Sequence, residues 1–128
     1  MPLMPPLLLV MAGGAIGAGC RHLLGVGALR AFGPGFPYGT FAANLIGGLL
    51  MGALAGIVAS GELPGAALRL FFGVGILGGF TTFSAFSLET FNMIEQGQVA
   101  LAGGYALASV VGAVAMLFLG LQLARTIA

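Results

Sequence analysis

The fold of this chain is decided by the stretch Gly73-Val-Gly-Ile-Leu-Gly-Gly-Phe-Thr-Thr-Phe-Ser-Ala-Phe-Ser87. It lies in a segment, residues 68–94, that carries no charge between Leu70 and Leu88. Because a helix needs about 20 mostly apolar residues to span a membrane, this segment predicts a spanning helix. Its glycines at 75, 78 and 79 favour a break in that helix, and the hydroxyls of Thr81 and Thr82 are available to the freed backbone.

A broken helix in a membrane has chemical consequences. Non-helical backbone is tolerated there only inside protein or beside a water-filled cavity. The break exposes carbonyls at one end and N–H groups at the other, which suit a cation and an anion respectively. The stretch therefore predicts either an ion site or a kink that serves close packing, and composition alone weighs the two equally.

The composition of the whole chain indicates a membrane protein. Charged residues make up 5% and hydrophobic residues 59% of 128 residues, against roughly 25% charged residues in an average soluble domain. The net charge of +1 and scattered arginines argue against a nucleic-acid partner. One His, one Cys and no Asp supply neither a catalytic triad nor a metal cluster, so we expect no enzyme.

Three further apolar segments complete an all-α fold of four transmembrane helices in a single domain, 1–128. They cover about 5–29, 39–59 and 99–124, and the connectors between the four helices hold Gly, Pro or polar residues. The first segment lacks a preceding basic region, so we expect it to span the membrane and not to be a cleaved signal peptide. Small residues four apart predict tight helix packing; they are Gly13 and Gly17, Gly48, Gly52 and Gly56, Gly75 and Gly79, and Gly104, Ala108 and Gly112.

The arginines predict how the chain inserts. An even number of spans puts both termini on one side, with Arg69 and Arg125 near that side and Arg21 and Arg30 toward the other. Orientation normally follows an excess of Lys and Arg in cytoplasmic loops, and this chain has almost none. We therefore expect it to insert both ways round and to pair as an antiparallel, dual-topology homodimer in the lipid bilayer.

Polar and aromatic residues inside the helices are candidates for a transport path. Asn44 is either glue between helices or an N–H donor beside an aqueous path. Phe80, Phe83 and Phe86 recur every three residues on one helix face, which favours packing; their positive ring edges are also able to solvate an anion. The interleaved Ser84 and Ser87 can add hydroxyl donors, and Tyr105 and Ser109 share a face that can extend a polar track.

Two ionisable residues lie inside or at the edge of apolar segments. Arg21 is able to reach the interface or to attract anions, and these two interpretations have equal weight. Glu89 most simply caps or pairs at a wet helix end.

Three motifs resemble the Fluc (CrcB) family of fluoride channels. They are Gly78-Gly-Phe-Thr-Thr-Phe-Ser-Ala-Phe-Ser87 followed by Glu89, Gly13-Gly14-x-x-Gly17-Ala18-x-x-Arg21, and Gly39-Thr40-Phe-x-x-Asn44-x-x-Gly47. The resemblance covers the whole chain. One departure is Ala85, where many relatives carry Thr.

The resemblance implies a fluoride-selective channel in the bacterial inner membrane that exports fluoride passively through two pores of an antiparallel homodimer. It implies that Phe83 and Phe86 line the pores, that Asn44 helps to coordinate fluoride, and that Tyr105 and Ser109 continue the polar track. It places Arg21 at an aqueous vestibule. It also implies a structural sodium ion at the dimer axis, held by the backbone carbonyls of Gly78 and Thr81 from both subunits.

Two other functions remain open from the residues alone. A small multidrug-resistance-type exporter is also short and inserts both ways, but it relies on an acidic residue in its first helix, and no acidic residue precedes Glu62 here. A non-transporting membrane assembly subunit would use the glycine faces for partners and the phenylalanines for packing.

Overall fold

The computed structural model describes residues 4–61 and 65–127 and consists of helices joined by short turns. Four helical spans are long and apolar enough to cross a membrane, which confirms the predicted all-α fold. The elements are α1 (Met4–Phe32), α2 (Tyr38–Ala59), a third span made of α3 (Gly65–Leu68), η1 (Arg69–Leu77), α4 (Gly78–Phe80) and α5 (Phe83–Glu95), and α6 (Val99–Ile127). Residues 1–3 and 62–64, and with them Glu62 and part of the second connector, lie outside the described residues.

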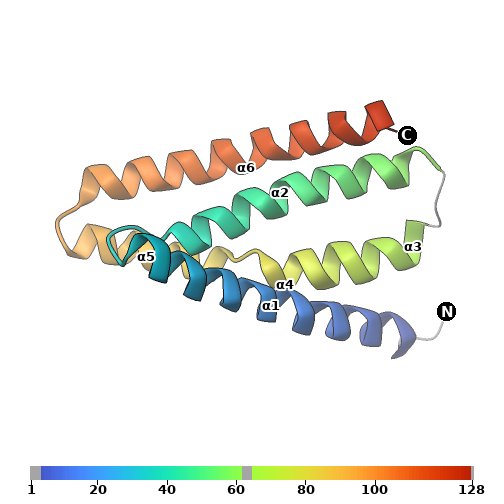
Figure 1. Ribbon diagram of the computed structural model, residues 1–128, viewed down its shortest axis with the longest axis horizontal. Helices are drawn as coiled ribbons and strands as arrows, with labels where there is room; N and C mark the ends of the chain where they lie inside the picture. Colours follow the sequence, from blue (N-terminus) through green and yellow to red (C-terminus); the bar gives the residue numbers. More distant parts are fainter. Residues whose placement is uncertain (1–3, 62–64, 128) are drawn as a thin grey trace.

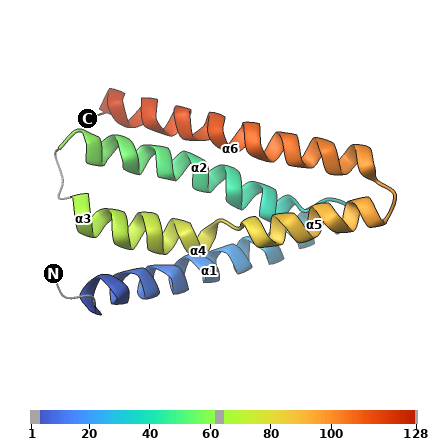
Figure 2. The same ribbon diagram turned by 180° about the vertical axis from the view of Figure 1, so that it is seen from behind.

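The helices run side by side with both ends of the chain at the same end of the bundle (Figure 1). In both views α2 lies between α6 and the third span, and α1 follows the third span on its other side (Figure 2). The α1–α2 and α5–α6 connections lie at the opposite end. This up-and-down order follows from short connectors, which leave consecutive helices no choice but to run antiparallel.

Two helix pairs approach with almost no side chains between them. A Cβ at Gly52 of α2 would overlap the Leu117 carbonyl of α6, and a Cβ at Gly17 of α1 would overlap the Ile76 carbonyl of the third span. This is the packing predicted from the small residues four apart. Gly104 is an exception, because a Cβ there would meet nothing within 4 Å in the described chain.

The third span is broken, as predicted, although the break falls after the glycines and not at them. Thr81 (φ −86°, ψ 159°) and Thr82 (φ −151°, ψ 123°) are extended and separate α4 from α5. Gly75 and Gly79 remain helical because they lie against α1, where a Cβ on Gly79 would come 2.5 Å from the Gly14 carbonyl. The segment before α4, η1, is a nine-residue π-helix. Such helices are rare in proteins, and those that occur are often found at functional sites.

The surface of the bundle is apolar over most of its length. Only small parts of the chain are buried, and large side chains such as Leu23, Leu107 and Phe118 are more than half exposed. In water such a surface would be unfavourable at about 25 cal/mol per Å². It is the surface expected of a protein surrounded by lipid.

Candidate functional site: the broken helix and its cavities

The side-chain amide of Asn44 in α2 forms hydrogen bonds with the backbone at the break in the third span. Its Nδ2 donates to the Thr82 carbonyl at 3.1 Å, and its Oδ1 accepts from the Thr82 N–H at 2.8 Å. The amide thus supplies an acceptor for the N–H that Thr82 turns away from the preceding helix, and a donor to the Thr82 carbonyl. Because the Asn side chain has two N–H donors and only one is used by Thr82, a second remains for another acceptor. Both sequence interpretations of Asn44, as interhelical glue and as a donor, are compatible with this geometry.

The backbone carbonyls at the break differ in whether a donor across the break reaches them. A helix end leaves its last four carbonyls without helical partners. Here Leu77 O accepts from the N–H and the hydroxyl of Thr81, at 3.0 and 2.9 Å, and Gly79 O accepts from Arg21 Nε at 3.2 Å. In the described residues no donor across the break reaches the carbonyls of Gly78 or Thr81.

A cavity of about 410 Å³ lies beside the break, between α2, α6 and the third span. Its wall is mostly apolar and carries a few polar groups. Of the residues predicted to form the pore or the sodium site, it brings together Asn44, Gly78, Thr81, Phe83, Phe86 and Ser109.

Ser109 is the polar side chain of this wall that is left without a partner. It is 6% exposed, and its hydroxyl has no hydrogen bond within the described residues. An unpaired buried hydroxyl costs about 1–3 kcal/mol by protein mutational data. The position therefore favours an occupant of the cavity that accepts or donates a hydrogen bond.

The phenylalanines do not form one stripe, which corrects the sequence prediction. Phe80 belongs to α4 and its ring approaches Gly47 of α2, whereas Phe83 and Phe86 belong to α5, beyond the break. The extended threonines rotate the chain between them, so a three-residue spacing no longer implies a shared face. The rings of Phe83 and Phe86 remain neighbours, with centroids 5.6 Å apart and planes at 44°.

Ser84 and Ser87 do not line the cavity. Both are exposed; the Ser87 hydroxyl donates to the Phe83 carbonyl at 2.8 Å, and Ser84 Oγ lies 3.3 Å from Thr82 Oγ1. Their roles as pore donors remain predictions.

A second polar cluster lies one helical turn further along α5. Glu89 Oε2 accepts from the Thr40 hydroxyl at 2.7 Å, and Glu89 Oε1 accepts from the Tyr105 hydroxyl at 2.9 Å. The Tyr105 side chain is 1% exposed and its ring lies 5.1 Å from Phe86, which places it next to the first cavity without lining it. Glu89 is therefore paired, one of the two roles expected for it, although the sequence did not identify Thr40 and Tyr105 as its partners.

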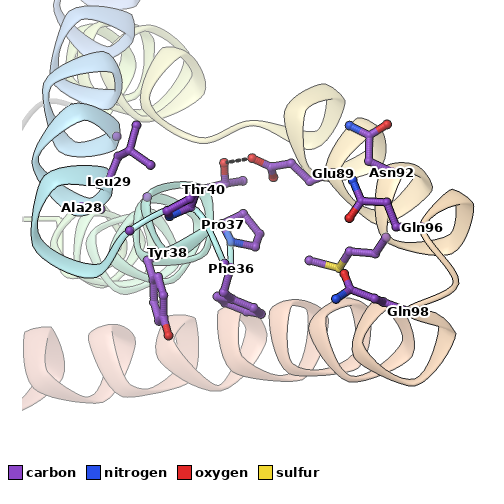
Figure 3. Close-up of a pocket in the computed structure, with 16 residues that line it drawn as sticks. Ala28, Leu29, Phe36, Pro37, Tyr38, Thr40, Glu89, Asn92, Gln96 and Gln98 are labelled. Atoms are coloured by element: carbon purple, nitrogen blue, oxygen red, sulfur yellow. Dashed lines mark hydrogen bonds between the residues drawn. The ribbon is translucent and has the colours of Figure 1, made fainter.

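This cluster borders a second cavity of about 370 Å³ at the end of the bundle away from the termini. Figure 3 shows Glu89 and Asn92 of α5, with Gln96 just after it, on one side, and Phe36 and Pro37 of the α1–α2 connection, with Tyr38 at the start of α2, on the other. Thr40 lies between them, with its hydroxyl directed at Glu89. The cavity is thus lined by carboxylate, carboxamide and aromatic groups.

Arg21 lies at a third cavity, of about 270 Å³, which also holds His22 and Thr40. This cavity and the second share Gly25, Leu29, Gly39 and Thr40 in their walls. The two cavities therefore adjoin each other, and the half-buried Arg21 lies at the one nearer the break. The vestibule role of Arg21 remains a prediction.

No group of three or more His, Cys, Asp or Glu side chains in the described part of the chain is able to hold a metal ion. The donors that suit a hard cation are backbone oxygens. The unpaired carbonyls of Gly78 and Thr81, on either side of Gly79 and Phe80, fit that requirement.

Fold and site together define a class: a four-helix membrane protein with a broken third helix beside a mostly apolar cavity that carries a few donors. The chain matches the family model described as CrcB-like protein, Camphor Resistance (CrcB), over residues 8–121. It therefore belongs to the CrcB family, a family of multi-pass proteins of bacterial membranes.

The similar proteins bear the name of an ion channel, which is not a class of enzyme. The chain is 60% identical to the Fluoride-specific ion channel FluC of Phenylobacterium zucineum, over 97% of this chain and 98% of that one. It is 54% identical to the channel of that name from Caulobacter vibrioides over the same shares. It is 52% identical to that from Sphingopyxis alaskensis, over 95% and 97%. The exporter and assembly-subunit alternatives find no support in these matches.

Proposed function

We propose that this chain is a fluoride channel that lets fluoride cross the bacterial membrane down its gradient. The observation that carries the proposal is the unpaired hydroxyl of Ser109, in a cavity that also holds the Asn44 amide and the rings of Phe83 and Phe86. The relatives named fluoride-specific channels support the choice of ion.

The chemistry of the cavity suits a small anion. Fluoride is strongly hydrated, so a conducting cavity must replace the water it strips away. Ser109 offers one O–H donor and Asn44 one unused N–H donor. The ring edges of Phe83 and Phe86 carry partial positive charge and add a weaker attraction. Neutral donors of this kind bind the ion loosely enough to let it leave, which conduction requires.

The path continues toward the polar end of the bundle. Phe86 lies against Tyr105, and the Tyr105 hydroxyl leads to Glu89 and Thr40 at the second cavity. Arg21 attracts anions into the shared space above these residues, because its charge is the one fixed positive charge in the walls of the described cavities.

We further propose that two chains assemble as an antiparallel homodimer with one pore per chain. Phe83 borders the cavity beside the break and is 78% exposed in the single chain; a second copy placed against this face would cover it. The carbonyls of Gly78 and Thr81 from both copies would then hold a sodium ion at the axis. When bound, this ion contributes a fixed positive charge and ties the two breaks together.

Anion efflux from liposomes that contain the purified protein tests the proposal. Fluoride and chloride electrodes are read side by side on the same vesicles. We expect fast loss of fluoride with no loss of chloride. Efflux of neither ion, from protein shown to be folded and dimeric, would refute the channel function.

A further inference from the structure

Among the described residues, Arg21 is the one charged side chain with a hydrogen bond to the backbone of the break. Its Nε donates to the Gly79 carbonyl at 3.2 Å, between helices that are 58 residues apart in sequence. The vestibule role that the resemblance implies needs only the charge. It does not require this bond, nor a guanidinium in place of another cation.

The position of Arg21 on α1 explains the contact. Residues 13, 17, 21 and 25 are four apart and therefore share one face of α1. Gly13 and Gly17 lie against the backbone of the third span, and Gly25 lies against Gly39 of α2. Arg21 is thus the single large side chain on a face made of glycines, and it stands at the level where the third span leaves the helix.

The Arg21 Nε–H gives a hydrogen-bond donor to the Gly79 carbonyl, which the break leaves without a helical donor. Gly79 O lost its helical donor when Thr81 and Thr82 became extended. A cation at a helix C-terminus also interacts favourably with the partial negative charge there. The guanidinium is planar and holds Nε in a fixed direction, whereas a lysine ammonium is a mobile point charge without that geometry.

We propose that Arg21 is a positioning residue that fixes the carbonyl end of the broken helix through its Nε–H···O=C bond to Gly79. It holds α4 against α1, so that the neighbouring carbonyls of Gly78 and Thr81 keep their directions. The inference rests on the proposed function only in assigning the break to the conduction site; the bond itself is a property of the fold.

The first test uses the wild-type protein and no variant. Solvent exchange of arginine Nε–H protons is measured by NMR on protein labelled in its arginines. Arg30, Arg69 and Arg125 are exposed and serve as internal controls. We expect the Arg21 proton to exchange at least about tenfold more slowly than those three, as for a donor held in a partly buried hydrogen bond. Exchange as fast as in the controls would overturn the proposal.

The second test separates the bond from the charge. Arg21→Lys keeps the positive charge, and Arg30→Lys is the matched control on the same helix. We expect backbone hydrogen exchange in the peptide covering residues 77–86 to accelerate about tenfold in Arg21→Lys and to stay unchanged in Arg30→Lys, because a hydrogen bond to a charged group contributes a factor of that order. Wild-type exchange in folded Arg21→Lys, with or without a change in fluoride efflux, would overturn the positioning role.

Neither readout depends on transport. A wild-type protein that holds its Arg21 proton but releases no fluoride would refute the channel function and leave the positioning role intact. If Arg21→Lys does not fold, the wild-type proton exchange still decides the matter.

Discussion

Ser109→Ala is the sharpest test of the proposed conduction site, because this hydroxyl is buried and has no partner in the described residues. An unpaired buried hydroxyl costs about 1–3 kcal/mol. Its removal leaves a hole of a single oxygen atom, which offsets part of that gain. We therefore expect the stability of Ser109→Ala to be unchanged or raised by about 1 kcal/mol.

The same substitution should damage transport. If the hydroxyl donates to the passing anion, its loss removes a hydrogen bond to a charged group, worth about 1.5–3 kcal/mol. We expect fluoride efflux to fall about tenfold or more, since 1.4 kcal/mol corresponds to a factor of ten. The assay is fluoride efflux from liposomes, with thermal unfolding in detergent as the measure of stability.

The control is Thr126→Ala, which removes a hydroxyl that donates to the Leu123 carbonyl near the end of α6, away from the cavities. It should leave efflux unchanged. A Ser109→Ala protein that loses more than about 1 kcal/mol of stability would show that the hydroxyl is bonded in the resting protein. That result would refute the reasoning, as would wild-type efflux from the variant.

Three other substitutions test the break, the aromatic wall and the helix packing. Asn44→Leu should abolish efflux and lower stability by about 2 kcal/mol or more, because it leaves the Thr82 N–H without an acceptor and removes a donor to the Thr82 carbonyl; thermal unfolding at wild-type temperature would contradict this. Phe86→Ala should reduce efflux strongly while chloride stays excluded, and unchanged fluoride efflux would assign the ring to packing alone. Gly17→Leu should yield no dimer on size-exclusion chromatography, because any side chain there overlaps the Ile76 carbonyl and prevents α1 from packing on the third span. Its control is Gly27→Leu, which should behave as wild type because a Cβ there meets nothing within 4 Å.

Much of the fold was predictable from sequence because the membrane imposes its own rules. The long uncharged runs allow few alternatives to spanning helices, and short connectors make them antiparallel. The small residues four apart predicted close packing, which Gly17 and Gly52 provide. The threonines near the break were recognised as partners of freed backbone, since such groups need an internal donor or acceptor in lipid.

The position of the break was decided only by the tertiary structure. Glycines permit a break, yet Gly75 and Gly79 lie against α1 and stay helical. The chain becomes extended at Thr82, where Asn44 of another helix bonds both the N–H and the carbonyl of the backbone. No local pattern contains that information, because the compensating amide is 38 residues away.

The contents of the site divide in the same way. The types of residue, an amide, hydroxyls and aromatic rings in an apolar chain, were evident from sequence and pointed to an ion path. The contacts among these residues were not evident from sequence. Phe80 is separated from Phe83 by the extended residues, Ser87 donates to its own helix, and Ser109 has no partner in the described residues. Hydropathy decides which solvent surrounds each helix, whereas the pairing of buried polar groups depends on how the helices are placed against one another.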